Sequence, residues 1–175
     1  MKRKLLSVIT ALALCLGLCP TYALAAEGNV ASVTVDGTTT YYSTLEGAYE
    51  AAVAASSATV TLLDNVTVER QVVAKQGDVT LDLNGKTITG QFALRTGSPS
   101  LTVRGSGTIT SSGTPITVES GKLTVEGGTI ETTSDLSFFG ATTIYVASPG
   151  TAAFHGGHII SPIGEKFIAL AIGDG

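Results

Sequence analysis

The stretch LTVEGGTIET, residues 123–132, decides the fold, because it alternates apolar and polar residues, breaks at a glycine pair, and alternates again. Alternation with a period of two is the pattern of a β-strand. The pair Gly127-Gly128 could form a phosphate-binding loop, a hairpin turn or the corner of a repeating coil. A phosphate loop is followed by a helix, whereas a strand follows this pair, so a turn or a corner remains.

Variants of the stretch recur along the chain, which favours the corner of a coil. They are LDLNGKTITG (81–90), LTVRGSGTIT (101–110) and AAFHGGHIIS (152–161). The isoleucines that follow the breaks, Ile88, Ile109, Ile130 and Ile159, are 21, 21 and 29 residues apart. A stack of antiparallel hairpins needs no constant spacing, whereas parallel coils place residues one period apart directly above one another. The period therefore predicts an all-β, single-stranded parallel β-helix of about 21 residues per coil over 58–175, with extra residues looping out at 134–141.

Alignment on these isoleucines predicts which residues stack. One inward column is expected to hold Leu83, Val103, Val125 and Phe154, and a second Leu94, Val118 and Val146. The outward column before the isoleucines is threonine, at Thr87, Thr108 and Thr129. The corners are expected to place structural residues where the chain turns, since glycine adopts positive φ at little cost. These are Gly85, Gly127, Gly128, Gly156 and Gly157.

The amino terminus is predicted to be a secretory signal peptide over 1–25. It has a basic start, an apolar middle and an Ala-x-Ala ending at Ala25. The segment contains both cysteines, so no disulfide is expected in the exported chain. Without Lys2, Arg3 and Lys4, ten basic side chains become seven against fourteen acidic ones, a formal charge of −7. This charge argues against nucleic acid as a partner, and the short apolar run argues against membrane insertion after cleavage.

Residues 26–57 are predicted to form two short strands and a helix that covers the end of the first coil. Ser43 and Glu46 fit a capping box, which predicts a helix over Ser43–Ser56. Leu45, Tyr49 and Val53 recur at helical spacing and are expected to face the coil.

At this point the sequence resembles a known family. YSTLEGAYEAA (42–52), ATVTLLDNVTV (58–68) and VTLDLNGKTITG (79–90) are similar to the amino-terminal portion of right-handed parallel β-helix proteins of the pectate-lyase-like superfamily, and to exported bacterial surface proteins with GGTI repeats. The resemblance implies a right-handed helix with an amphipathic cap, and gives Asn84 a structural role in a turn that bonds to neighbouring coils. It does not imply one activity, because the architecture carries lyases, hydrolases, adhesins and stalks.

The catalytic motifs of that superfamily are not found in this sequence. Its lyases use aspartates that hold calcium and an arginine base, and its hydrolases use closely spaced aspartates. Asp78 and Asp82 would lie about 13 Å apart on one strand, too far for a carboxylate pair. His155 and His158 lack a third metal ligand close in sequence. We therefore assign no catalytic residue, metal or cofactor, with calcium expected only if the protein is a lyase.

Five side chains are candidates for ligand binding. Tyr145, Phe138 and Phe139 could stack on sugars, whereas Phe154 is expected in the core. Arg95 and Arg104 are expected to face Glu119 and Glu126 on adjacent coils, either as a small glycan or ion site or as exposed ion pairs of little energy.

The sequence alone favours a non-catalytic, secreted or cell-surface bacterial module of the adhesin type that binds glycan or cell-surface protein. The alternatives are a polysaccharide lyase or glycoside hydrolase with its catalytic residues in 134–141 or beyond Gly175, and a passive stalk. The last coil starts at FIALAIGDG (167–175) and stops within itself, which predicts further coils or an anchor domain beyond Gly175.

Overall fold

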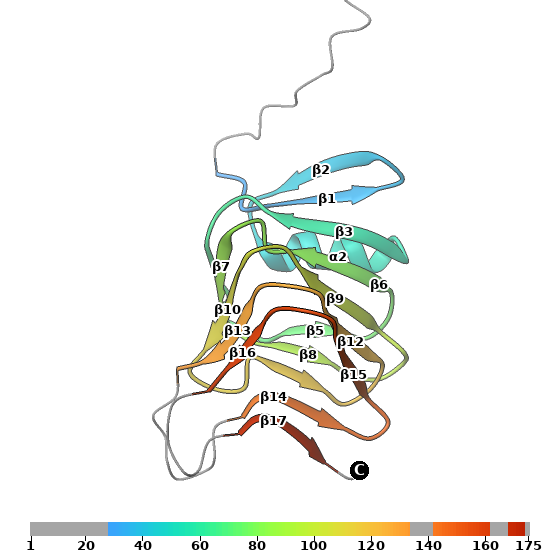
Figure 1. Ribbon diagram of the computed structural model, residues 1–175. Coiled ribbons are helices and arrows are strands. Elements are labelled where there is room, and N and C mark those ends of the chain that lie inside the picture. The colour runs from blue at the N-terminus through green and yellow to red at the C-terminus, as the bar shows by residue number, and fades with distance from the viewer. Residues whose placement is uncertain (1–27, 134–141, 162–167, 174–175) are drawn as a thin grey trace, which may run out of the picture.

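The protein is an all-β parallel solenoid with one helix near its amino terminus, as a computed structural model shows (Figure 1). The structure describes residues 28–133, 142–161 and 168–173, and for 168–173 it describes the backbone alone. The predicted signal peptide, Phe138 and Phe139 lie outside the described residues. Each coil places one strand in each of three sheets, which we call the first, second and third sheet in chain order.

The strands of each sheet follow one another along the solenoid axis. The first sheet holds β3 (Ser57–Leu62), β6 (Asp78–Asp82), β9 (Ser100–Arg104), β12 (Lys122–Val125) and β15 (Thr151–Phe154). The second holds β4 (Val66–Thr67), β7 (Lys86–Thr89), β10 (Gly107–Ser111), β13 (Thr129–Thr132) and β16 (His158–Ile160). The third holds β5 (Val72–Ala74), β8 (Phe92–Leu94), β11 (Ile116–Val118), β14 (Thr142–Ala147) and β17 (Ile168–Gly173). All these strands pair in parallel, so the predicted parallel coil is confirmed and a stack of hairpins is wrong.

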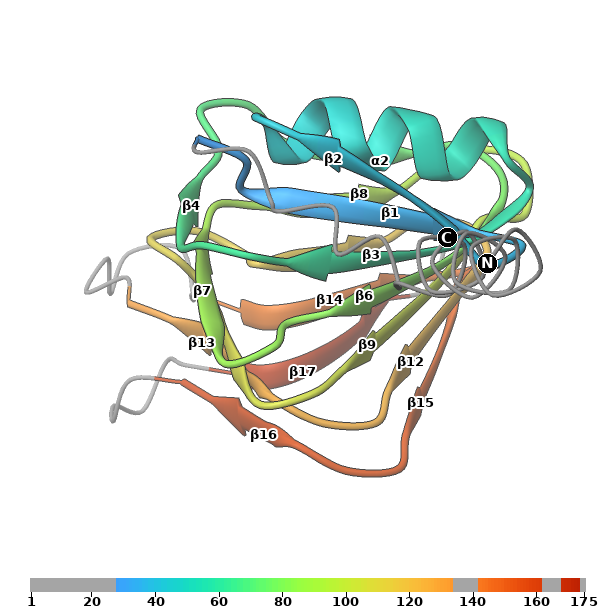
Figure 2. The same cartoon turned by 90° about the horizontal axis from the view of Figure 1, so that it is seen from above.

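The hand of the solenoid follows from the two views. Seen from the amino-terminal end in Figure 2, the chain runs clockwise through the three sheets while it moves away from the viewer. The helix is therefore right-handed, the hand that parallel crossover connections take in almost all proteins.

The register confirms two of the predicted columns and corrects a third. The four isoleucines stack in the second sheet with the threonines beside them, and Leu94, Val118 and Val146 stack in the third. In the first sheet, however, Val103 pairs with Leu81, so the prediction of Leu83 in this column is wrong. Leu83 is buried at the following corner, and the corner length explains the slip. The isoleucine of the second sheet follows Leu81 by seven residues, Val103 by six and Val125 by five.

Phe154 continues the column beyond Val125, as predicted, but it is 38% exposed rather than part of the core. It lies on β15, which has a described neighbouring strand on one side only. A column that is buried between two coils is only half-covered at such an edge.

The amino-terminal end of the solenoid is covered by a hairpin and by the helix. β1 (Ala31–Val35) pairs antiparallel with β3 and with β2 (Thr38–Tyr42), which extends the first sheet. Asp36 and Gly37 both have positive φ, as a two-residue hairpin turn of type I′ requires. The hairpin therefore pairs the edge of β3 that would otherwise be exposed.

The helix α2 (Leu45–Ala54) contacts β1, β3, β5 and β6 across the end of the first coil. Its amino-terminal cap is Thr44, whose hydroxyl accepts from the Gly47 amide at 3.2 Å, so the predicted cap at Ser43 is wrong by one residue. Leu45 and Tyr49 are buried as predicted, whereas Val53 is only partly buried. The Tyr49 ring meets the edge of Phe92, 6.0 Å away between centroids, which anchors the helix to the interior.

The two glycines of each pair have different structural roles at the corner. The second glycine takes positive φ, 79° at Gly128 and 84° at Gly157. The first allows neighbouring coils to approach, since a Cβ at Gly156 would lie 2.5 Å from the Glu126 carbonyl oxygen. Both glycines therefore have a structural role in the coil.

Candidate functional site

The outer face of the first sheet carries a continuous row of six threonines, one from each successive strand, which we call the threonine column. Its members, in order along the axis, are Thr39, Thr34, Thr59, Thr80, Thr102 and Thr124. Adjacent strands are about 4.8 Å apart, so the column runs for about 24 Å. Ala153 follows on β15 and ends the row. Thr124, the last threonine, is only 9% exposed, so five members of the column reach the surface.

The threonines face outward because their neighbours along each strand face inward. Val33, Val60, Leu81, Val103 and Val125 are buried in the core, and side chains alternate between the two faces of a strand. The column crosses from the hairpin into the coils without a break, since the antiparallel register of β1 with β3 pairs Thr34 with Thr59. Thr34 and Thr39 are already linked, with 2.9 Å between their hydroxyl oxygens.

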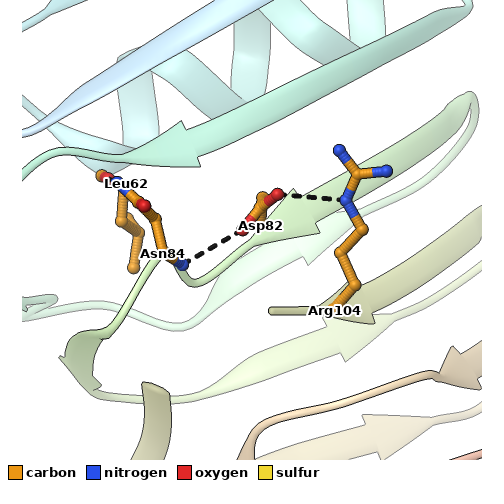
Figure 3. Close-up of polar contacts among 4 residues, drawn as sticks. All are labelled: Leu62, Asp82, Asn84 and Arg104. Atoms are coloured by element: carbon orange, nitrogen blue, oxygen red, sulfur yellow. Dashed lines mark hydrogen bonds and ion pairs between the residues drawn. The ribbon is translucent and has the colours of Figure 1, made fainter. Parts of the chain in front are cut away.

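A charged pair, Asp82 and Arg104, lies two residues beyond Thr80 and Thr102 of the column, and Figure 3 shows its polar contacts. Arg104 Nε donates to Asp82 Oδ2 at 3.1 Å, and the backbone amide of Asn84 donates to Asp82 Oδ1 at 3.1 Å. Arg104 and Glu126 follow the paired Val103 and Val125 on adjacent coils, as predicted, but the ion pair of Arg104 is with Asp82 and not with Glu126. The cause is the corner slip described above, which places Asp82 and Arg104 in one register. Asp82 thereby accepts hydrogen bonds from two donors.

Asn84 has a structural position at the same corner. It has φ 46°, and its side-chain Nδ2 donates to the Leu62 carbonyl oxygen of the preceding coil at 2.8 Å. Gly85 follows with φ 75°. The asparagine therefore turns the chain and ties two coils together, and its amide is engaged within the fold.

Arg95 and Glu119 form the second ion pair, with 2.9 Å between Arg95 Nε and Glu119 Oε1. They belong to adjacent coils, as predicted. Both side chains are 44% exposed, so solvent and salt screen the attraction, and the pair contributes about 0–1 kcal/mol to stability. The geometry is that of a surface ion pair.

Tyr145 lies on β14, in register with Thr117 of β11 and Ala171 of β17, on the outer face of the third sheet. It is half-exposed and far along the coil from the threonine column, since the two belong to different sheets. The structure therefore does not bring Tyr145 together with Arg104 in one site.

The histidines are exposed, and His158 takes the outward position above Thr129, as the alignment predicts. Within the part of the chain that the structure describes, no three histidine, cysteine, aspartate or glutamate side chains cluster closely enough to hold a metal ion. No helix in that part is long and apolar enough to cross a membrane.

Sequence reasoning found hydroxyl columns on the coils but missed the longest one. Thr34 and Thr39 lie in the hairpin, outside the 21-residue repeat. Strict alternation in VTV (33–35) and the threonine run 38–40 was the available signal. The column could not be predicted because it depends on the antiparallel register of the hairpin, and the period of the coils does not give this register.

The fold and this face define a class: a right-handed parallel β-solenoid with hydroxyl groups repeated along its outer surface. Comparison with models of protein families, with curated proteins and with solved structures found no match to this chain.

Proposed function

We propose that the protein is a non-catalytic surface-binding module of the adhesin type, which binds extended glycans through the outer face of its first sheet. The observation that carries the proposal is the threonine column. Five threonines that reach the surface, from Thr39 to Thr102, place hydroxyl groups at strand spacing and offer both donors and acceptors along about 19 Å of a rigid surface. A glycan chain is an extended, repeating partner with the same kind of groups.

The energetics favour binding through repetition rather than at one tight point. Each hydroxyl contact exchanges a hydrogen bond to water for one to the ligand, so its net gain is about 1 kcal/mol or less. A rigid column lowers the conformational entropy lost on binding, and many copies on one surface would raise the avidity. The acidic balance of the chain, −4 at neutral pH, favours neutral or basic partners over polyanions.

The proposal includes export to the bacterial cell surface, on the strength of the basic and apolar start of the chain. It also includes attachment through further coils or an anchor domain beyond Gly175, because multivalent binding needs many copies held together. No cofactor is part of it. The fold is the one that the resemblance to the pectate-lyase-like superfamily implies, and that superfamily supplies the enzymatic alternative to be tested.

The test is retention on insoluble neutral polysaccharides by the protein displayed in many copies on beads. The double variant Thr80→Val and Thr102→Val keeps the branched shape of both side chains and removes two adjacent hydroxyl groups. It should lose most of the retention. The matched control, Thr87→Val and Thr108→Val, makes the same change on the second sheet and should be retained like the parent.

Two results would overturn the proposal. If the parent is retained on no glycan, the proposed glycan binding is wrong. If it releases unsaturated or reducing ends from polygalacturonate or other uronic-acid polymers, with or without calcium, and loses this activity when Asp78, Asp82 or Asp135 is changed, it is a lyase or a hydrolase.

A further inference from the structure

A second polar feature lies at the corner between the second and third sheets, away from the threonine column. It is a groove of about 330 Å³ that crosses three successive coils, and we call it the corner groove. Its walls and floor come from residues 67–71, 89–91 and 111–113. None of these residues belongs to the face proposed to bind extended glycans.

The groove exists because the three corners differ in length. Four residues separate β4 from β5 and four separate β10 from β11, whereas only two, Gly90 and Gln91, separate β7 from β8. The middle corner is therefore recessed between two longer ones and becomes the floor. Gly90 is required there, since a Cβ would lie 1.8 Å from Val68 Cγ2.

Hydrogen bonds hold the far wall and the floor in place. Gln91 Nε2 donates to the Thr114 carbonyl oxygen at 3.2 Å, and the Gly113 amide donates to Ser111 Oγ at 3.0 Å. Thr132, from the next coil, donates its hydroxyl to the Gly113 carbonyl oxygen at 2.8 Å. A site that is already ordered loses little conformational entropy when a ligand binds.

The lining is polar and carries charges that cancel. Glu69 and Arg70 stand on the near wall, and among the described residues neither forms an ion pair. Gln91 uses its amide nitrogen within the fold, which leaves its side-chain oxygen as an acceptor, and Ser112 is exposed on the opposite wall. The groove thus offers donors and acceptors from both sides without net charge.

We propose that the corner groove binds one neutral sugar ring, such as a terminal or branching unit of a glycan. Adjacent hydroxyl groups of a sugar both donate and accept hydrogen bonds. The groove offers acceptors at Glu69 and Gln91, donors at Arg70, and a hydroxyl group at Ser112 that can do both. The volume lies at the small end of ligand sites, which fits one ring rather than an oligosaccharide. An anionic sugar would be repelled by Glu69 and by the net negative charge of the chain. The inference deepens the proposed glycan binding but rests on different residues.

The test is nuclear magnetic resonance titration of the labelled full chain with methyl glycosides of glucose, galactose, mannose and N-acetylglucosamine, and with glucuronate. At least one neutral glycoside should shift the amide signals of 67–71, 89–91 and 111–113, with a millimolar dissociation constant. Ser112→Phe fills the groove from an exposed position and should weaken binding at least tenfold. Ser106→Phe, an equally exposed serine at a different corner, should leave it unchanged.

Arg70→Ala should weaken binding without altering the melting temperature. The proposal is overturned if no neutral glycoside shifts these signals, if glucuronate alone does, or if Ser112→Phe binds like the parent. Thr80→Val with Thr102→Val should leave these shifts intact. If the double variant is retained on polysaccharides like the parent, or the parent is not retained at all, while a neutral glycoside still shifts these signals, the proposed face is refuted and the corner groove stands.

Discussion

Replacing Tyr49 by phenylalanine should make the protein more stable. The side chain lies on α2, is 2% exposed, and packs its ring against the edge of Phe92. Its hydroxyl oxygen is buried and has no hydrogen-bond partner among the described residues. Phenylalanine keeps the ring contact and removes the one group that lost its hydrogen bond to water on folding.

The size of the effect follows from the cost of that group. A buried hydroxyl without a partner costs about 1–3 kcal/mol, and the small void left by the missing oxygen offsets part of the gain. We expect the free energy of unfolding to rise by about 1–2 kcal/mol. For a chain of this length each kcal/mol moves the melting temperature by about 2–4 °C, so Tm should rise by about 2–8 °C.

The pH dependence gives an independent readout of the same burial. Burial raises the pKa of Tyr49 above its ordinary value, because the interior does not solvate the phenolate. The folded state therefore keeps the proton to a higher pH than the unfolded state. The contribution of the neutral phenol is fully present below pH about 10 and is lost as the pH rises further. Phenylalanine does not ionise, so the variant does not lose this stability. The difference in free energy of unfolding between the variant and the parent should therefore grow above pH about 10.

The assay is urea and thermal unfolding by circular dichroism at neutral pH and above pH about 10. Tyr42→Phe, a half-buried tyrosine on β2, is the matched control and should change stability by less than about 0.5 kcal/mol. A Tyr49→Phe protein that is less stable than the parent would show that the hydroxyl has a partner. An unchanged advantage at high pH would show that it is not buried.

Three further changes test the coil, its corner and its cap by thermal unfolding. Gly90→Ala places a Cβ 1.8 Å from Val68 Cγ2 and should cost about 1–3 kcal/mol, and a neutral result would show that the corner can relax. Asn84→Ala leaves the Leu62 carbonyl without its donor and puts alanine at φ 46°, so it should cost about 1–3 kcal/mol, whereas no change would remove its structural role. Leu45→Asp buries a charge under the cap and should unfold or aggregate the protein, and an unchanged Tm would show that α2 covers nothing.

The stacking of the coils could be predicted from the sequence because it is a local signal repeated at a fixed distance. Ile88, Ile109 and Ile130 each follow a threonine and are 21 residues apart, and this spacing predicts their pairing. The first sheet could not be aligned in the same way. Leu83 and Leu81 are both apolar and both buried, so composition does not tell which one pairs with Val103. Corner length decides the register, and it varies from coil to coil.

The candidate sites were harder to predict for the same reason. Asp82 and Arg104 form a pair only because one corner is longer than the next. The threonine column depends on an antiparallel hairpin, which the repeat does not predict. The cap was found at the right place but with the wrong residue, since Ser43 and Thr44 are both good capping residues. Which of the two accepts the Gly47 amide depends on the backbone that enters the helix.

These differences show where a solenoid of this kind has freedom to acquire binding sites. Inward positions are mostly apolar, because each is buried between the coils above and below it, and the buried Ser111 and Thr132 are exceptions. Outward positions carry no such constraint. Corners are constrained at particular residues, such as Gly90 and Asn84, but their length differs from coil to coil. Outward positions repeat with the coil and therefore build rows, such as the threonine column. Corners differ in length and therefore build recesses, such as the groove at Gly90. A repeating polymer fits the threonine column, and a single sugar ring fits the corner groove. The two proposed sites therefore need separate ligands and separate controls.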